Sequence, residues 1–295
     1  MTRVCIVGNS HVAALRNGSA RIAAEFPDIE ATFFGVPGRW LRSVKLEQGH
    51  NGTPGSLAPA DPEHSAFFRK MSGGQDRINV ADYDCFILVG LELSIFRWLS
   101  FYYQMRHEPF SFEVGAPQIL DADTFANCRG RIFEGTAGST VFKGLQEVGA
   151  TSISLCPQPM PVSSILDEQK SWQILFQHED VDLVESAFRE DLLRGFPEAA
   201  RVFWQPDLTR SGPLLTGPRY SKWYCGEGMP QTGRQGDHQH MNADYGAETL
   251  RAIYSELAGC SDLLTPRLDP QESVPSRGAV HILPAESVAS ASVTG

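Results

Sequence analysis

The sequence predicts an α/β protein: a three-layer sandwich in which helices cover both faces of a five-stranded parallel sheet. Short apolar segments alternate with amphipathic segments along the chain, which is typical of a parallel sheet covered on both faces. The chain has 295 residues, of which 42% are hydrophobic, enough for one packed domain with a large core.

The strands and helices are predicted from this alternation. The expected strands are Val4–Val7, Ala31–Phe34, Cys85–Val89, Ser152–Leu155 and Val202–Trp204. The expected helices lie near residues 12–25, 135–148, 178–194 and 243–258. Together they form a domain over residues 1–263, and the segment 264–295, rich in Pro, Ser, Ala and Val, is expected to be a poorly ordered tail.

Three segments interrupt the alternation and are interpreted as insertions at about 39–80, 91–130 and 207–236. The first is rich in Gly, Pro and polar residues. The second begins with an aromatic run, for which two interpretations stay open: an extra helix packed on the core, or a cap that forms a substrate wall or a partner surface. The run consists of Phe96, Trp98, Phe101, Tyr102 and Tyr103.

Composition limits the partners and the compartment. The net charge is −10 and no basic run occurs, which argues against a nucleic-acid partner and favours a small molecule or a glycan. No stretch approaches the ~20 apolar residues of a membrane span, and no signal peptide is visible. The six cysteines show no metal-binding or CxxC spacing, so we expect reduced thiols in a cytoplasmic protein.

The first motif with chemical meaning is Val7–His11, where the first strand ends and the first helix begins. A serine at this turn presents Oγ at the carboxyl edge of the sheet, where open α/β folds bind ligands. The helix N-terminus also offers backbone N–H groups to a developing anion. Ser10 is therefore a candidate nucleophile, and the alternative is that it only caps the helix.

The second motif is Asp237–Asn242, directly before the last predicted helix. A carboxylate three residues from an imidazole can orient that ring through Nδ1, so that Nε2 faces a serine. Asp237 and His240 are therefore candidates for the general-base pair. The alternatives are a helix-capping Asp237, or a metal site formed by Asp237, His238 and His240; because no second ligand cluster completes a shell, we predict no metal and no cofactor.

Taken together, the two motifs resemble the SGNH/GDSL-like hydrolase superfamily. Its first block, Gly-Asp-Ser, corresponds to Gly8–Ser10, and its last block, Asp-x-x-His, corresponds to Asp237–His240. The resemblance implies the flavodoxin-like SGNH fold, without a cofactor, and ester hydrolysis or acyl transfer.

The resemblance extends to three less specific blocks between these two. The segment Gly35–Gly38 resembles the glycine block, which implies Gly38 as an oxyanion donor, with Gly35 in reserve. The segment Val89–Glu92, including Gly90, stands where the family has Gly-x-Asn, and Cys156–Pro159 resembles its proline-rich turn.

Two residues depart from the family pattern. Asn9 replaces an aspartate, and its amide can make similar hydrogen bonds. Glu92 replaces the asparagine that donates to the oxyanion, which an ionised carboxylate cannot do. Three explanations remain open: Glu92 points away from the site, burial keeps it protonated, or the protein is not a competent esterase.

The loop Gly217–Gly226 is aromatic and basic and precedes the last motif. It is a candidate substrate loop, with Trp223 as a platform for a sugar ring and Arg219 or Lys222 meeting an anionic group; ordinary loop packing is the alternative. The predicted function is thus an esterase or O-acyltransferase acting on a small acylated metabolite or glycan. The competing hypothesis is a non-catalytic carbohydrate-binding module, which Glu92 favours.

Overall fold

A computed structural model describes residues 1–50, 53–106, 118–177, 180–225 and 237–259. Residues Met1–Ala258 form one compact unit, and the second unit, Gly259–Gly295, contains the predicted tail, which lies outside the described residues. Among the described residues, no helix is both long and apolar enough to cross a membrane.

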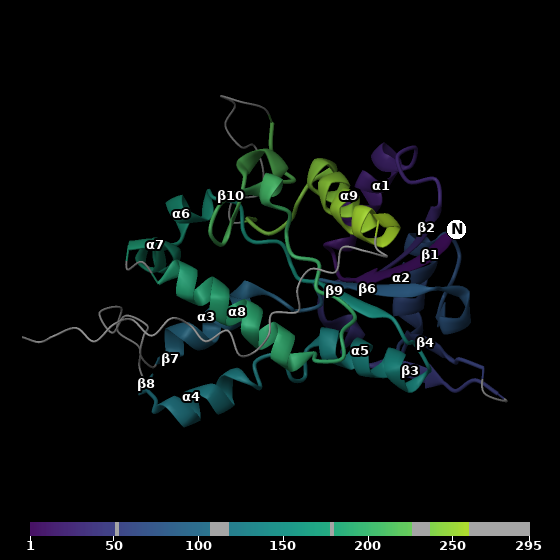
Figure 1. Ribbon diagram of the computed structural model, residues 1–295, viewed down its shortest axis with the longest axis horizontal. Coiled ribbons are helices and arrows are strands. Elements are labelled where there is room, and N and C mark those ends of the chain that lie inside the picture. The colour runs from purple at the N-terminus through teal and green to yellow at the C-terminus, as the bar shows by residue number, and fades with distance from the viewer. Residues whose placement is uncertain (51–52, 107–117, 178–179, 226–236, 260–295) are drawn as a thin grey trace, which may run out of the picture. The chain divides into compact units, whose positions relative to one another are not determined.

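A four-stranded parallel sheet forms the centre of the first unit (Figure 1). Its strands, in the order β2-β1-β6-β9, are β2 (Ile29–Gly35), β1 (Thr2–Gly8), β6 (Cys85–Val89) and β9 (Ile153–Cys156). The chain turns to opposite sides of β1 for β2 and β6, so the carboxyl end of β1 is a topological switch point. Open α/β sheets bind ligands at such points.

The predicted fifth strand is present only as a parallel bridge between Leu155 and Val202. Backbone hydrogen bonds flank it, from Leu155 N to Arg201 O at 2.9 Å and from Phe203 N to Leu155 O at 2.7 Å. The α/β class is therefore confirmed, whereas the count of five strands is not.

Helices cover both faces of the sheet, as the alternation of buried residues along β1 requires. Val4 and Ile6 belong to one core cluster with α1 (Val12–Ile22) and α9 (Ala243–Gly259), which lie together on one side in Figure 1. Cys5 and Val7 point into the opposite cluster. That second cluster contains residues of α3 (Ile95–Gln104), α5 (Ala137–Glu147) and α8 (Val181–Gly195).

Two glycines bring α1 and α9 into close contact. A Cβ on Gly18 would lie 2.3 Å from the backbone nitrogen of Ala247, and a Cβ on Gly246 would lie 1.9 Å from the carbonyl oxygen of Ala14. Larger side chains would force the helices apart. Because Ser10 precedes α1 and His240 precedes α9, this contact also sets how closely the two predicted catalytic residues approach each other.

The predicted insertions contain regular elements of their own. Residues 39–80 hold a three-stranded antiparallel sheet and α2 (Pro62–Ser72). Two 3₁₀ helices cross the ends of this segment: η1 (Gly38–Arg42) begins one residue before it, and η2 (Val80–Asp82) ends two residues after it. The three strands of that sheet are β3 (Val44–Glu47), β4 (Ser56–Pro59) and β5 (Ile78–Asn79).

The segment 91–130 holds α3, β7 (Met105–Arg106), β8 (Gln118–Ile119) and α4 (Ala122–Arg129). Trp98 and Tyr102 of the aromatic run are fully buried in α3, which favours a core helix over a substrate wall. After β9 come α6 (Ile165–Glu168), α7 (Lys170–Gln177) and α8. The described part of the third insertion holds η4 (Asp207–Thr209), β10 (Arg210–Gly212), β11 (Leu215–Thr216) and η5 (Pro218–Tyr220).

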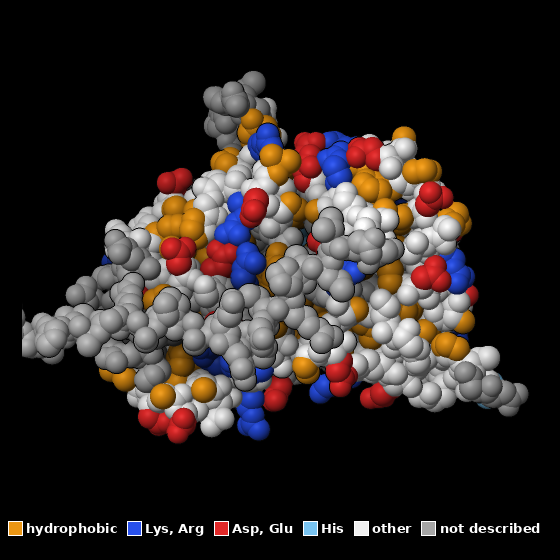
Figure 2. All heavy atoms as spheres, viewed as in Figure 1, with side chains coloured by type: hydrophobic (Ala, Val, Ile, Leu, Met, Phe, Trp, Pro, Cys, Tyr) orange, Lys and Arg blue, Asp and Glu red, His pale blue; other side chains and the backbone are white. Residues whose placement is uncertain are grey.

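Charged side chains of both signs are interspersed on the surface. On the face shown in Figure 2, Lys and Arg side chains lie beside Asp and Glu side chains. Ion pairs such as Arg251 with Glu25, at 2.7 Å, join side chains of opposite charge.

Candidate active site

Ser10 lies in the turn between β1 and α1, at the switch point of the sheet. The N-cap of α1 is His11, without a side-chain capping bond, so Ser10 is not the cap that the alternative interpretation required. Gly90 closes the turn from the neighbouring strand. Its φ of 70° favours glycine, and a Cβ there would lie 2.6 Å from Asn9 Oδ1 and 2.9 Å from the His11 ring.

The structure brings Ser10, His240 and Asp237 together. Ser10 Oγ lies 3.0 Å from His240 Nε2, and His240 Nδ1 lies 2.8 Å from Asp237 Oδ1. An imidazole with a carboxylate at Nδ1 and a hydroxyl at Nε2 is arranged to accept the hydroxyl proton. Asp237 does not cap α9, since Asn242 Oδ1 accepts the N–H of Tyr245, at 3.0 Å, in the first turn of that helix.

Trp223 holds Asp237 from the side opposite His240. Its indole Nε1 donates a hydrogen bond to Asp237 Oδ2 at 2.9 Å. Partial burial raises the pKa of Asp237, but hydrogen bonds from Trp223 and His240 outweigh it and hold the pKa below its ordinary value. Asp237 is therefore ionised at neutral pH, and both of its oxygens have donors.

A backbone bridge positions His240. Ser221 and Met241 form an antiparallel bridge, and the N–H of Lys222 donates to the carbonyl oxygen of His240 at 2.9 Å. The candidate substrate loop and the Asp237–Asn242 motif are thus joined through their main chains, so a shift of the loop would move His240 as well.

A second imidazole, that of His11, stacks on His240. The ring centroids are 5.6 Å apart and the planes are inclined by 22°. His11 is buried, and among the described residues its Nδ1 has no hydrogen-bond partner. Burial, and then the neighbouring His240, lower the pKa of His11 to about 3, against the opposing effects of Gln158 and Asp237. His11 is therefore neutral at physiological pH.

His238 faces away from Ser10 and belongs to a different hydrogen-bonded group. Its Nδ1 lies 3.1 Å from Ser164 Oγ, and its Nε2 lies 3.1 Å from Glu168 Oε2. The alternative metal site formed by Asp237, His238 and His240 therefore does not fit the geometry. Within the described part of the chain, no group of His, Cys, Asp and Glu side chains is arranged to hold a metal ion.

A pocket of about 530 Å³ opens beside Ser10. Of the two glycines considered as oxyanion donors, Gly35 lines this pocket. The lining continues through Val36 and Pro37. Gly38 is the next residue, and it begins η1. The remaining lining consists of Asn9, His11, Ala13, Ala14, Asn17, Phe67, Met71, Lys222, His240, Met241, Asn242 and Ala243.

Glu92 is bound on both of its oxygens. Oε2 accepts from Arg42 Nε at 3.0 Å and from the backbone N–H of Ala137 at 2.9 Å, and Oε1 accepts from Arg42 Nη2. Burial raises the pKa of Glu92, but the hydrogen bonds from Arg42 and Ala137 outweigh it and hold the pKa below its ordinary value. The explanation that Glu92 is a buried, protonated donor is therefore wrong.

The backbone at Glu92 is also unusual. Leu91 and Glu92 adopt φ values of 51° and 68° directly after Gly90, which costs energy for residues with a side chain. Glu92 lines a smaller pocket of about 340 Å³ together with Asn9, and it is not among the residues that line the pocket beside Ser10. This arrangement favours the explanation that the carboxylate points away from the reacting atoms.

Three other predicted residues have partners that the sequence did not indicate. Asn9 Oδ1 accepts the backbone N–H of His11 at 3.3 Å, which holds the turn around Ser10. Trp223 uses its polar edge on Asp237, and the Lys222 ammonium lies 5.0 Å from its ring centroid, so the structure gives it a supporting position instead of a free platform. Arg219 stacks on the Tyr220 ring at 4.6 Å and does not line the pocket; Lys222 does.

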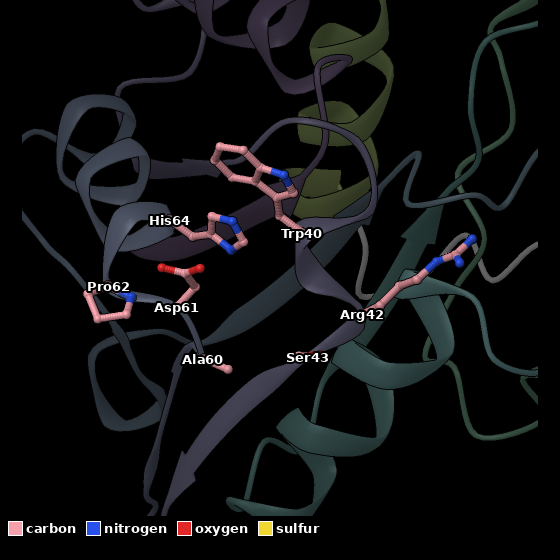
Figure 3. Close-up of a pocket in the computed structure, with 7 residues that line it drawn as sticks. All are labelled: Trp40, Arg42, Ser43, Ala60, Asp61, Pro62 and His64. Atoms are coloured by element: carbon pink, nitrogen blue, oxygen red, sulfur yellow. The ribbon is translucent and has the colours of Figure 1, made fainter.

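Another open pocket, of about 650 Å³, is lined by residues that include Trp40, Asp61 and His64 (Figure 3). The Trp40 ring stacks on His64 with centroids 3.7 Å apart, and it meets edge-on the ring of Phe67, which lines the Ser10 pocket. In Figure 3 the Arg42 side chain extends away from the other labelled residues, toward α5.

Sequence reasoning missed His11 and Arg42 as parts of this region. His11 belongs to the first motif, Val7–His11, so its position directly after Ser10 in the sequence could have indicated that it lies in the site. Arg42 is 50 residues from Glu92, and its pairing depends on how the first insertion folds, for which the sequence carries no signal that we can identify.

Comparisons with known proteins give distant structural matches only. No protein-family model and no curated protein matches the chain. It is similar to a GDSL-like lipase from Bacteroides thetaiotaomicron, with 10% identity, a TM-score of 0.39 and coverage of 88% of each chain. It is also similar to the periplasmic domain of a lipopolysaccharide acetyltransferase from Salmonella ser. Paratyphi A, with 10% identity, a TM-score of 0.40 and coverage of 87% of this chain and 84% of that one. The function is therefore inferred from the geometry of this chain's own side chains.

Proposed function

We propose that the chain is a serine-dependent ester hydrolase or O-acyltransferase of the SGNH/GDSL type. Ser10 is the nucleophile, His240 the general base and Asp237 the group that orients His240. The observation that supports this most is the pair of contacts at 3.0 Å and 2.8 Å that joins Ser10 Oγ to Asp237 through the two nitrogens of His240.

The reaction consists of two acyl transfers. In the first, Ser10 Oγ attacks the carbonyl carbon of an ester while its proton passes to His240 Nε2. The tetrahedral intermediate then expels the alcohol, which takes that proton, and the acyl group remains on Ser10. In the second, water or an acceptor hydroxyl gives a proton to Nε2 and attacks the acyl group, and Ser10 leaves with its proton restored. Water gives an acid, and an acceptor hydroxyl gives a new ester.

The developing negative charge needs hydrogen-bond donors. The proposed donors are the backbone N–H groups of Ser10 and Gly38, with Gly35 in reserve. Ser10 lies one residue before the N-cap of α1, which supports the first of these, because the N-terminus of a helix carries a partial positive charge. Glu92 does not belong to this set, because its carboxylate is an acceptor already bound by Arg42 and Ala137.

The proposed substrate is a small acylated metabolite or an acylated glycan. The mainly apolar lining of the pocket beside Ser10 suits an acyl chain, and the open pocket with Trp40 gives room for an alcohol part or an acceptor. We place the reaction in the cytoplasm; Cys5, Cys85, Cys128 and Cys156 are thiols, the form that is usual in that compartment.

Labelling with a fluorophosphonate probe, combined with turnover of para-nitrophenyl acetate, tests this proposal. Ser10→Ala should abolish both labelling and turnover while leaving the circular dichroism spectrum unchanged. Ser164→Ala is the matched control, because Ser164 also has its hydroxyl near a histidine nitrogen, at 3.1 Å from His238. It should keep both activities.

Two outcomes would contradict the proposal. Undiminished turnover in Ser10→Ala would show that the nucleophile is another group. A folded wild-type protein that neither labels nor hydrolyses esters, yet binds glycans, would favour the carbohydrate-binding module instead.

A further inference from the structure

The pocket beside Ser10 combines an apolar interior with a single cation. None of the described residues that line it is Asp or Glu, and Lys222 is its only Lys or Arg. Val36, Phe67, Met71 and Met241 supply apolar surface. An uncharged ester would gain nothing from the ammonium, whereas a substrate with a negative group would gain an ion pair.

Lys222 is held in a fixed relation to the candidate catalytic residues. Its backbone N–H donates to the carbonyl oxygen of His240 at 2.9 Å, and its ammonium lies 5.0 Å from the centroid of the Trp223 ring, whose N–H binds Asp237. Within the described part of the chain, no carboxylate lies within ion-pair distance of Lys222. The ammonium is thus oriented by its neighbours but not neutralised by them.

A second cation lies close to the same pocket. Arg16, exposed on α1, donates from Nη1 to the sulfur of Met71 at 3.4 Å, and Met71 lines the pocket. Arg21, further along the same helix, is paired with Asp244, whereas Arg16 has no ion-pair partner among the described residues. On a chain of net charge −10, two such cations at one pocket create a local potential that attracts anions.

We propose that this pocket takes esters that carry a carboxylate or another anionic group, and that Lys222 binds that group. The inference rests on the proposed function and specifies its substrate class. Lys222 acts on substrate binding, since a lysine ammonium meets an anion as a point charge. Arg16 adds to the attraction at longer range. Because both cations are exposed, the preference for anionic esters should weaken as the salt concentration rises.

Two matched pairs of esters test the inference. They also show whether Lys222 binds a negative group on the acyl part or on the alcohol part of the substrate. The first pair is mono-para-nitrophenyl adipate and its methyl ester, in which the charge is on the acyl part. The second is meta-acetoxybenzoate and its methyl ester, in which the charge is on the alcohol part. For each pair, the ratio of kcat/KM for the charged ester to that for the neutral ester is measured in wild type and variants.

In Lys222→Met, that ratio should fall about 10-fold for at least one pair, mainly through a higher KM, as expected for the loss of one charge-assisted contact. Lys222→Arg should restore most of it. Lys143→Met is the matched control, because Lys143 is also an exposed lysine but lies on α5 and does not line the pocket; it should leave the ratio unchanged.

The outcomes separate this inference from the proposed function. If wild type hydrolyses the esters and the ratio for both pairs is unchanged in Lys222→Met, the inference is wrong and the proposed function stands. An equal fall in Lys143→Met also overturns it, because the effect would then be one of net charge. If wild type turns over none of the four esters, both are overturned.

Discussion

The imidazole of His11 lies nearly parallel to that of His240, with ring centroids 5.6 Å apart and an angle of 22° between the planes. The two rings differ in environment, since His11 is buried and His240 reaches solvent, with 40% of its side chain exposed. Its low pKa keeps His11 neutral, so that it packs against the candidate base without repelling the imidazolium that forms during catalysis.

This arrangement predicts an acid-dependent loss of stability. The pKa of His11 is lowered from 6.5 to about 3 in the folded protein, so below pH 6.5 the unfolded chain binds a proton that the folded protein does not. Stability due to this group is therefore complete above pH 6.5 and falls as the pH drops toward 3. Between pH 7 and pH 5 the loss should be about 2 kcal/mol.

His11→Phe keeps a ring in the stack and removes the titrating group. Urea unfolding of wild type and variant at pH 7 and pH 5 measures the difference, because other groups contribute equally to both proteins. Between these pH values, the free energy of unfolding of the variant should fall by about 2 kcal/mol less than that of wild type. Equal losses would show that His11 becomes protonated without unfolding.

A second prediction concerns Trp223 and Asp237. Trp223→Phe removes the N–H that donates to Asp237 Oδ2 at 2.9 Å but retains an aromatic ring. Asp237 should still be ionised but less firmly oriented, so kcat for para-nitrophenyl acetate should fall about 10-fold with little change in KM. Asp237→Asn should cost more, about 10³-fold or greater, because it removes the charge that stabilises the imidazolium.

Trp204→Phe is the control for this experiment. Trp204 packs on Phe188 and under Arg189 and does not line the pocket beside Ser10, so its replacement should lower stability without changing kcat. A Trp223→Phe variant with unchanged kcat would show that the indole hydrogen bond has no part in catalysis.

The elements that the sequence predicted correctly share a local signal. The prediction of a strand over Cys85–Val89 is confirmed residue for residue, because five apolar residues followed by glycine define both its burial and its end. The order of strands and helices likewise places Ser10 and the Asp237–His240 segment at one edge of the sheet. Their proximity follows from packing, since the helices that come after them, α1 and α9, are in close contact.

The features that were not predicted depend on contacts between segments that lack such a signal. The Arg42–Glu92 pair joins two insertions, and the bond from Trp223 to Asp237 depends on a loop whose course no periodicity describes. Arg219 and Lys222 were equivalent in the sequence, and the structure distinguishes them, since Lys222 is joined to His240 through its backbone and lines the pocket, whereas Arg219 stacks on Tyr220. The fifth strand was predicted from the apolar run Val202–Trp204, of which Val202 alone bridges to the sheet, at Leu155.

The third prediction separates the two histidines of the last motif. His238 is buried between Ser164 and Glu168, so His238→Ala leaves two polar groups without their partner and should destabilise the fold by about 2 kcal/mol. The kcat of the His238→Ala variant should change less than about 3-fold. His240→Ala should have the opposite pattern, with normal stability and no measurable turnover. Thermal melting and steady-state kinetics on both variants measure these effects, and a larger loss of kcat in His238→Ala would reverse the assignment.

The last prediction concerns Glu92, for which the sequence left three explanations open. A repelling carboxylate at the oxyanion position would make Glu92→Asn more active by up to about 10²-fold, since an amide donor would replace it. The contacts with Arg42 and Ala137 predict another result. Glu92→Asn should change kcat less than about 3-fold and lower stability by about 1 kcal/mol, the usual worth of a partly exposed pair.

The stability loss should depend on pH, because the folded protein holds the pKa of Glu92 below 4.5. The stabilisation by the ionised carboxylate is complete above that value and disappears as the pH falls through the lowered pKa, so wild type and variant should converge in acid. Glu92→Gln, Arg42→Met and the double variant complete a cycle whose coupling energy should be about 1 kcal/mol at pH 7. A coupling near zero, together with a large gain in kcat for Glu92→Asn, would place the carboxylate at the reacting atoms and contradict the pairing as its main role.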